Sequence, residues 1–245
     1  MDFFSIQVDE KKDGGLTLTP NFIVGRSKDL MVRGRSFYAI WDEEAGLWLT
    51  DEYELGRLVD AEMRKYAEHN HPGQNVSIKS MTNYNSKSWI NYRTFVSNIS
   101  DSYHQLDENL TFANQEVKKT DYVSRRLPYS LEPGDCSSWD EIVGTLYSVE
   151  ERRKIEWAIG SIVAGDSKKI QKFFVFYGLP GTGKSTIMTV VEKLFNGYTT
   201  KFEAKALGSS SNSFATEAFK SNPLVAIQHD GDLSRIDDNT LLNSI

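Results

Sequence analysis

The residues best suited to chemistry form an octet of the type Gly-x-x-x-x-Gly-Lys-Ser, which runs from Gly178 to Ser185. An apolar run at residues 172–177, rich in Phe and Val, precedes the octet and has the length and composition of a buried parallel strand. Apolar side chains at helical spacing follow it, and Asn196-Gly197 indicates where that helix ends. Strand, glycine-rich loop and helix are together the context that a phosphate-binding loop requires. We therefore interpret the octet as a phosphate-binding loop rather than as a glycine-rich turn that binds nothing.

Each residue type in this loop has a physical role. The glycines let successive backbone N–H groups turn toward phosphate oxygens, and the helix N-terminus adds its partial positive charge. Lys184 is expected to reach the β- and γ-phosphates of a nucleotide, and the Ser185 hydroxyl is expected to complete the Mg²⁺ shell. The predicted nucleotide-binding residues are Gly178, Pro180, Gly181, Thr182, Gly183, Lys184, Ser185 and Thr186.

Two acidic residues follow a later apolar run. Residues 223–229 read as a buried strand, and Asp230 and Asp232 come at its C-terminal end. A carboxylate in this position is the Walker B arrangement, in which the acid faces the metal. Asp230 is the first candidate and Asp232 the second, with an ordinary acidic turn as the alternative. The predicted metal ligands are therefore Ser185, Asp230 and Asp232, and the predicted catalytic residues are Lys184 and Asp230. The adjacent His229 is expected to have a structural role rather than to contact nucleotide.

Composition sets limits on the class of protein. A chain of 245 residues with 39% hydrophobic residues can build one large or two modest cores. A net charge of −6 and a pI near 5.3 argue against nucleic acid covering the whole surface, although a few local cations can still hold one strand. The lone Cys136 allows neither a disulfide nor a zinc cluster within the chain, which fits a reducing cytoplasm. The sequence has no recognisable signal peptide and no apolar run long enough to span a membrane.

Helices must support the loop from the segment before it. Residues 127–136 contain Pro and Gly and read as a connector. A helix beginning at Ser137 or Ser138 is expected next, and the capping-box pattern of Ser148 and Glu151 predicts the start of another helix, which Gly165 ends. We refer to these two helices as the collar. After the loop helix, the pattern predicts a strand at residues 198–204 and a helix at residues 214–220.

The first third of the chain is expected to be mixed in structure. The pattern predicts a strand at residues 3–8, and it predicts the two arms of a hairpin at residues 37–41 and 47–50. Amphipathic helices are expected at residues 51–69 and 86–100, and a short hairpin at residues 110–117. Trp89 and Tyr92 lie on the apolar face of the second helix, where a place in the core is favoured over stacking on bases.

The order of these segments resembles the helicase part of phage- and plasmid-type primase–helicases, which are superfamily 3 helicases related to poxvirus replication helicases. The resemblance covers most of the chain from about Phe37 onward. Its most specific motif is the Walker A loop within residues 173–186. The rest is similarity of pattern, in the hairpin with Trp41 and Trp48, the segments 106–117, 120–123 and 126–129, and the collar helix with Trp139.

The resemblance implies a ring-forming, ATP-driven motor that moves along single-stranded DNA at a replication fork. It implies ATP and Mg²⁺ as cofactors, held by Lys184 and Ser185, with Asp230 in the Walker B place. The family usually has an acidic residue there, often Glu, so the Asp230-Gly231-Asp232 version leaves that assignment open. The implied partners are single-stranded or forked DNA and further copies of the full-length protein in a ring. A primase would be a separate chain, no membrane is involved, and the location is the host-cell cytoplasm.

The expected fold is an α/β P-loop NTPase of the AAA+-like kind with a partial parallel sheet, preceded by a mixed α+β N-terminal region and the helical collar. The expected domain boundaries are 1–134, 135–166 and 167–245. A doubly wound nucleotide-binding domain needs about five strands, and only three are recognisable here. The chain is therefore expected to be truncated within its ATPase domain. The family's polar sensor, pore hairpin and arginine finger would all lie after Ile245.

Two other functions remain as alternatives. A kinase can use the same loop for phosphoryl transfer, but it needs a lid and an acceptor site after the loop, and the long collar would be unusual. A truncated, non-catalytic protein that assembles or interferes with a full-length helicase is the second alternative. Phosphorylation of a small acceptor without DNA would favour the kinase, and co-purification with an intact ring without ATPase activity would favour the non-catalytic protein.

Overall fold

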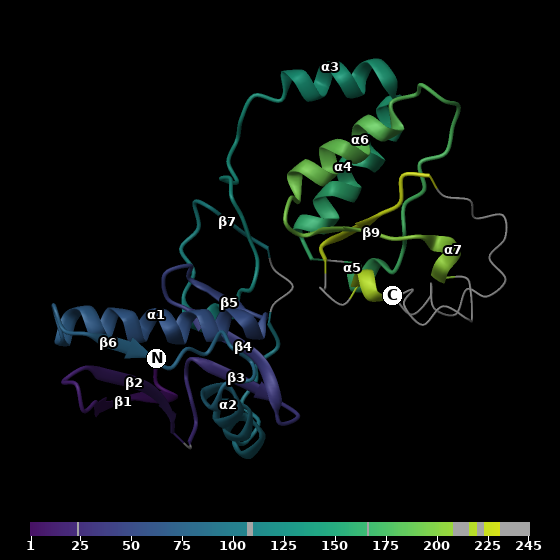
Figure 1. Cartoon of the computed structure of the whole chain (residues 1–245). Coiled ribbons are helices and arrows are strands. Elements are labelled where there is room, and N and C mark those ends of the chain that lie inside the picture. The colour runs from purple at the N-terminus through teal and green to yellow at the C-terminus, as the bar shows by residue number, and fades with distance from the viewer. Residues whose placement is uncertain (24, 107–109, 166, 208–215, 220–222, 231–245) are drawn as a thin grey trace. The chain divides into compact units, whose positions relative to one another are not determined.

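The chain forms two compact units, Met1–Arg126 and Leu127–Ile245. They are seen in a computed structural model that describes residues 1–245 except 24, 107–109, 166, 208–215, 220–222 and 231–245 (Figure 1). The first unit ends earlier than the expected boundary at residue 134. The collar helices and the predicted phosphate-binding loop both lie within the second unit.

The first sheet of the N-terminal unit combines neighbouring and distant strands. β1 (Phe4–Glu10) pairs antiparallel with β2 (Leu16–Phe22), with Phe4 opposite Phe22, so the predicted first strand is confirmed. The connecting turn contains Gly14 at φ 77°, a left-handed conformation that glycine adopts without steric cost. β6 (Val76–Ile78) then pairs parallel with β2, an arrangement that requires a long crossover between them.

The second sheet contains the predicted hairpin. β4 (Ser36–Asp42) pairs antiparallel with β5 (Leu47–Leu49), and β3 (Leu30–Arg33) adds on the other side of β4. The Asp42 carboxylate accepts hydrogen bonds from the N–H groups of Glu44 (2.9 Å) and Ala45 (3.1 Å). This local bonding by an Asp side chain explains why the turn forms where the sequence predicts it.

Both amphipathic helices of this unit are confirmed. α1 (Glu52–Asn70) begins after Asp51, whose side chain accepts a hydrogen bond from the Tyr53 N–H, and α2 (Lys87–Asn98) begins after Ser86, which accepts one from Trp89. Both helices contact β2 and β4, and their apolar faces are buried in the core that they share with these strands. Tyr92 is fully buried and Trp89 packs beside it, so both belong to the core as expected. The fully buried residues of this core include Leu18, Val32, Ile40, Leu55, Val59, Met63 and Met81.

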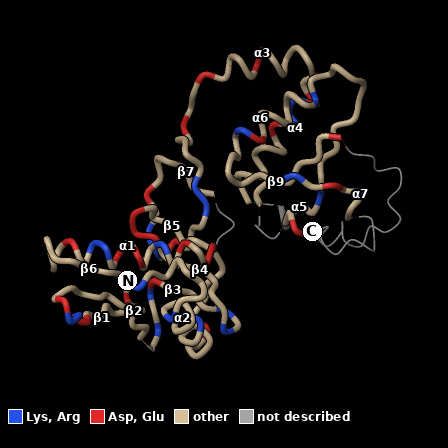
Figure 2. Tube along the Cα trace, viewed as in Figure 1, with Lys and Arg blue, Asp and Glu red and all other residues tan. Residues whose placement is uncertain are grey.

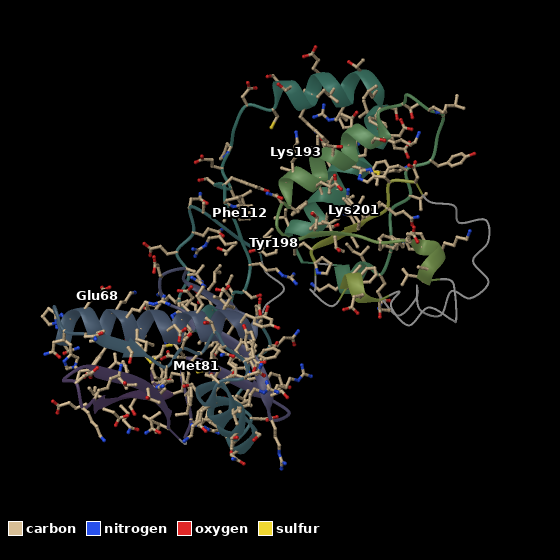
Figure 3. All side chains as sticks on the ribbon, in the orientation of Figure 1. Glu68, Met81, Phe112, Lys193, Tyr198 and Lys201 are labelled. Carbon is tan, nitrogen blue, oxygen red and sulfur yellow. The ribbon has the colours of Figure 1, made fainter. Side chains whose placement is uncertain are left out.

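One buried carboxylate holds an irregular segment against α1. Asp60 is 1% exposed and accepts hydrogen bonds from the backbone N–H of Met81 (2.7 Å) and from the Ser80 hydroxyl. Met81, labelled in Figure 3, has no exposed surface and belongs to the same core. The segment between β6 and α2 is thus fixed to α1 by a polar contact inside the core.

The short hairpin expected at residues 110–117 is not present. β7 (Thr111–Phe112) pairs instead with β8 (Arg126–Leu127), and the Gln115 side chain turns the chain back by accepting from Phe112 N–H (3.0 Å). The residues between these strands pass close to Trp48, whose indole N–H donates to the Lys119 carbonyl at 2.9 Å. These contacts join residues far apart in the chain, so local sequence patterns could not predict them.

The collar helices of the second unit form as predicted. α3 (Ser137–Leu146) is followed by α4 (Val149–Val163), and Ser148 and Glu151 make the reciprocal bonds of a capping box. Arg152 of α4 forms ion pairs with Asp140 of α3 and with Glu156. The Trp139 indole N–H and the Arg152 guanidinium both donate to Glu156, and they lower the pKa of its carboxyl.

The segments after the collar only partly follow the expected pattern. α5 (Ser167–Ile170) and α6 (Lys184–Leu194) flank the loop, and the expected strands at residues 198–204 and 223–229 appear as β9 (Thr199–Lys201) and β10 (Val225–Ile227), which pair in parallel. α7 (Ala204–Leu207) follows β9. Within the helix expected at residues 214–220, residues 217–219 form a short 3-10 helix and Thr216 lies in a turn, while 214, 215 and 220 lie outside the described residues.

The strand expected at residues 172–177 is not formed in the structure. β9 and β10 pair with each other, and neither pairs with this segment among the described residues. Phe173 and Tyr177 are 66% and 97% exposed, whereas Phe176 packs on the collar. An apolar run becomes a buried strand only when hydrogen-bonded neighbours cover it, and this run has none in the described sheet.

None of the helices in the described part of the chain combines the length and hydrophobicity needed to cross a bilayer.

We expect Asp60→Ala to lower the free energy of unfolding by about 1–3 kcal/mol, because the Met81 N–H would remain buried without an acceptor. Asp60→Asn keeps an acceptor oxygen for that N–H and is the matched control, so it should cost less. Urea unfolding followed by circular dichroism measures both values. Equal losses for the two variants would show that the hydrogen bond to Met81 does not stabilise the core.

Candidate nucleotide-binding site

The predicted phosphate-binding loop has the backbone geometry of an anion site. Gly178, Gly181 and Gly183 have φ values of 156°, 80° and 77°, a region that side chains disfavour and glycine tolerates. α6 begins immediately after Gly183, and the first bond of the helix runs from Ile187 N–H to the Gly183 carbonyl (3.1 Å). The N–H groups at positions 184–186 therefore precede the helical ladder and remain directed out of its N-terminus. Such N–H groups, with the helix dipole, attract phosphate oxygens.

The ammonium group of Lys184 lies over this loop. Its Nζ donates to the carbonyls of Leu179 (2.7 Å) and Gly178 (2.9 Å) and to the Thr182 hydroxyl (3.2 Å). The Thr182 hydroxyl in turn donates to the Leu179 carbonyl at 2.9 Å. The positive charge is thus held by weak neutral acceptors on the loop itself. A phosphate oxygen is a stronger partner for an ammonium than a neutral carbonyl, so the lysine can exchange these contacts for a ligand.

The end of the first collar helix covers the loop, which the sequence did not predict. A Cβ placed on Gly183 would lie 2.4 Å from Leu146 Cδ1 and 3.5 Å from the Tyr147 hydroxyl. The Tyr147 hydroxyl is buried and has no hydrogen-bond partner among the described residues, and burial, with a smaller contribution from Glu151, raises its pKa. Two features therefore favour glycine at position 183: its positive φ and its close approach to Leu146. The motif indicated the first reason, but nothing in the sequence identified Leu146 as the neighbour.

A small core beneath the loop connects it to the collar. Ile187, one turn into α6, is fully buried with Val143 of α3 and Ile155 of α4. Phe176, the residue two positions before the loop, packs against the same group. The N-terminal turn of α6 is thus held from below by apolar contacts and from the side by Leu146, which restricts the movement of the loop backbone.

Asp230, the predicted acidic residue of the site, lies after β10 beside His229. Asp230 is exposed and follows β10, and its backbone carbonyl accepts from the Gln228 side chain at 3.1 Å. The neighbouring His229 contacts Glu192 of α6 through its Nε2 (3.1 Å), which agrees with the structural role expected for it. Lys201, labelled in Figure 3, lies 4.0 Å from the same carboxylate. Glu192 is about two helical turns beyond Ser185.

The predicted nucleotide-binding residues lie together in one segment, whereas the predicted metal ligands are only partly among the described residues. Residues 178–186 form one continuous loop and helix start, with the Ser185 side chain exposed. Within the described residues, Asp230 forms no hydrogen bond or ion pair with Ser185 or Lys184, and no three or more His, Cys, Asp or Glu side chains converge as a metal site. Asp232 lies outside the described residues. The loop fits the phosphate chain of a nucleotide. Of the ligands expected for Mg²⁺, only the hydroxyl of Ser185 is at the loop.

We expect Gly183→Ala to destabilise the protein more than Gly181→Ala does. Both substitutions place a side chain at positive φ, which costs about 1–2 kcal/mol. Only at position 183 must Leu146 also move, whereas nothing lies within 4 Å of a Cβ at position 181. Leu146 is 39% exposed and its Cδ1 is the end of a flexible side chain, so it can shift, and the additional loss should lie at or below the low end of the roughly 1–3 kcal/mol that overpacking of a core costs. Thermal unfolding of both variants measures the difference.

The Leu146→Ala background provides the control for this comparison, because it removes the side chain that a Cβ at position 183 would strike. In that background the two glycine substitutions should have similar effects on unfolding. A difference that persists unchanged would contradict the packing of the collar on the loop.

No protein-family model, no curated protein and no solved structure was found to match this chain.

Proposed function

We propose that this chain is the nucleotide-binding part of an ATP-dependent DNA helicase of the superfamily 3 type, from a phage or plasmid replication system. The observation that carries the proposal is the loop at Gly178–Ser185. Its glycines adopt positive φ, its helix presents free N–H groups, and the Lys184 ammonium lies over it with exchangeable contacts. The resemblance to phage and plasmid primase–helicases supports the choice of a DNA motor over other enzymes with such a loop.

In the proposed reaction, the loop N–H groups bind the phosphate chain of ATP while Lys184 releases the carbonyls of Gly178 and Leu179 to bind the β- and γ-phosphates. Ser185 offers its exposed hydroxyl as a ligand for Mg²⁺, which when bound neutralises charge on the phosphates. Asp230 is proposed as the carboxylate on the metal side. In that role its carboxylate would hold the Mg²⁺ together with the Ser185 hydroxyl.

The proposed partners follow from the same resemblance. They are single-stranded or forked DNA, further copies of the full-length protein in a ring, and a primase on a separate chain, all within the cytoplasm of the host cell.

A second candidate function has one specific observation in its favour. Phe173, Phe174, Val175 and Tyr177 form an exposed apolar run, and the ring of Phe174 contacts Trp157, which is itself 53% exposed. Contiguous exposed apolar surface of this kind marks contact with another chain. A non-catalytic protein that assembles with a full-length helicase would use such a surface. ATPase activity in the purified chain would favour the motor, and co-purification with an intact helicase without ATPase activity would favour the second function.

We expect Lys184→Ala to weaken binding of ATP roughly 10- to 100-fold, because a charge-assisted hydrogen bond contributes about 1.5–3 kcal/mol. ATPase activity of the full-length protein should be abolished. Lys193→Ala, at the exposed end of the same helix, is the matched control and should bind ATP normally. Titration with a fluorescent ATP analogue measures both affinities. Near wild-type binding and turnover by Lys184→Ala would refute the phosphate-binding assignment.

We expect Asp230→Asn to weaken Mg²⁺-dependent nucleotide binding more than Asp232→Asn does, because Asp230 is closer to the end of β10. The measurement is nucleotide titration with and without Mg²⁺ for each variant. Without Mg²⁺ the two variants should bind equally. A larger effect of Asp232→Asn would transfer the metal role to that residue.

A further inference from the structure

The tip of the hairpin between β3 and β4 presents two arginines on a constrained turn. Arg33 pairs with Ser36, which leaves Gly34 and Arg35 as a two-residue loop with φ values of 59° and 61°. Positive φ at both positions belongs to the tight hairpin turn in which Gly, Asn and Asp are favoured. An arginine in this conformation is uncommon. Both arginine side chains are exposed, and Figure 2 shows the tip of the hairpin in blue.

A carboxylate from a distant segment braces this turn. Asp101 accepts hydrogen bonds from the N–H groups of Gly34 (2.9 Å) and Arg35 (3.3 Å), and these bonds lower the pKa of its carboxyl. The next residue, Ser102, donates its N–H to the Val32 carbonyl at 2.9 Å. Asp101 thus uses both oxygens on the backbone of the turn. Neither guanidinium forms an ion pair within the described part of the chain.

Aromatic rings from the same distant segment lie beside the arginines. The Arg33 guanidinium lies 4.8 Å from the centre of the Tyr103 ring, and that ring is 46% exposed and packs edge-on against Tyr38 at 5.5 Å. The adjacent His104 is exposed and stacks on Tyr122 with ring centres 3.8 Å apart and planes 8° apart. Each exposed ring is therefore supported on its inner side by another ring.

We infer that this surface, formed by Arg33, Arg35, Tyr103 and His104, binds single-stranded nucleic acid. Grooves that hold single strands combine cations for the phosphates with aromatic rings on which the bases stack. Here the cations are at the turn and the rings are on the segment that braces it. Guanidinium groups suit phosphate because they donate in a planar fork. A local surface of this kind is also compatible with the net charge of −6.

The inference rests on the proposed function, because it gives a surface to the single-stranded DNA proposed there as a partner, but all of its residues lie in the N-terminal unit, apart from the nucleotide site. It can therefore be tested without ATP. Failure of the proposed ATPase and failure of this surface give different results. Lys184→Ala should bind an oligonucleotide as well as the unaltered chain does, even though it binds ATP more weakly.

The test is binding of a fluorescein-labelled oligothymidylate of 20 nucleotides to the whole chain, followed by fluorescence anisotropy in a salt series. Arg33→Gln combined with Arg35→Asn removes both charges, and Asn tolerates the left-handed backbone at position 35. This variant should bind at least about tenfold more weakly. Its slope of log K against log salt should fall by about 1.4, from about 0.7 for each lost phosphate contact.

A second variant separates stacking from charge. Tyr103→Leu should weaken binding by about tenfold, the loss expected for one stacked base, while the salt slope stays close to that of the unaltered chain. The matched control is Arg64→Gln combined with Lys65→Gln, which removes two exposed charges from α1 and should change binding by less than about twofold. Oligouridylate of the same length tests RNA against DNA, and binding of either supports the inference.

Three results would overturn the inference. They are unchanged affinity in the Arg33/Arg35 variant, an equal loss in the Arg64/Lys65 control, and displacement of the oligonucleotide by polyglutamate as effectively as by unlabelled oligothymidylate. The last result would identify a surface for acidic polypeptides instead. Thermal unfolding of each variant shows whether the fold is kept. A variant that unfolds is replaced by the single Arg35→Asn substitution, for which a reduced slope supports the inference and an unchanged slope contradicts it.

Discussion

The close contact between Leu146 and Gly183 is the constraint on which the rest of the second unit depends. A Cβ at position 183 would lie 2.4 Å from Leu146 Cδ1, so any larger residue there would have to displace the Leu146 side chain. It sets the end of α3 against the start of α6, directly above the core that contains Ile187. The loop backbone is thereby held in the conformation that directs its N–H groups outward, before any ligand arrives. A loop held in this way loses less conformational entropy when it binds phosphate.

In the N-terminal unit, two carboxylates fix the path of the backbone. Asp60 inside the core and Asp101 at the surface each accept from backbone N–H groups of a segment that has no regular structure of its own. Because a buried or constrained N–H without a partner is costly, these bonds decide the path of the chain at both places. The two carboxylates differ in their exposure to solvent. Asp60 completes the packing around Met81, whereas Asp101 leaves two guanidinium groups extended toward solvent.

The two units thus offer complementary chemistry. The second unit provides N–H groups and an ammonium at a helix start, which suits the phosphate chain of a nucleotide. The first unit provides guanidinium groups beside aromatic rings, which suits a strand with both phosphates and bases. The exposed apolar residues before the loop are a third kind of surface, and they suit contact with another polypeptide.

The sequence by itself determined those elements whose causes are local. Helices α1, α2, α3, α4 and α6, the β4–β5 hairpin and the Ser148–Glu151 capping box all follow from periodicity and side-chain bonds over a few residues. The loop could also be predicted from the sequence as a nucleotide-binding candidate, because its glycines and lysine lie within seven residues of one another. Tertiary structure alone decided which strands pair. Residues 172–177 have the composition of a buried strand yet find no partner in the described sheet, while β7 joins β8 and β6 joins β2. The same is true of Leu146 above Gly183 and of His229 beside Glu192, since contacts between distant residues leave no periodic trace in a single sequence.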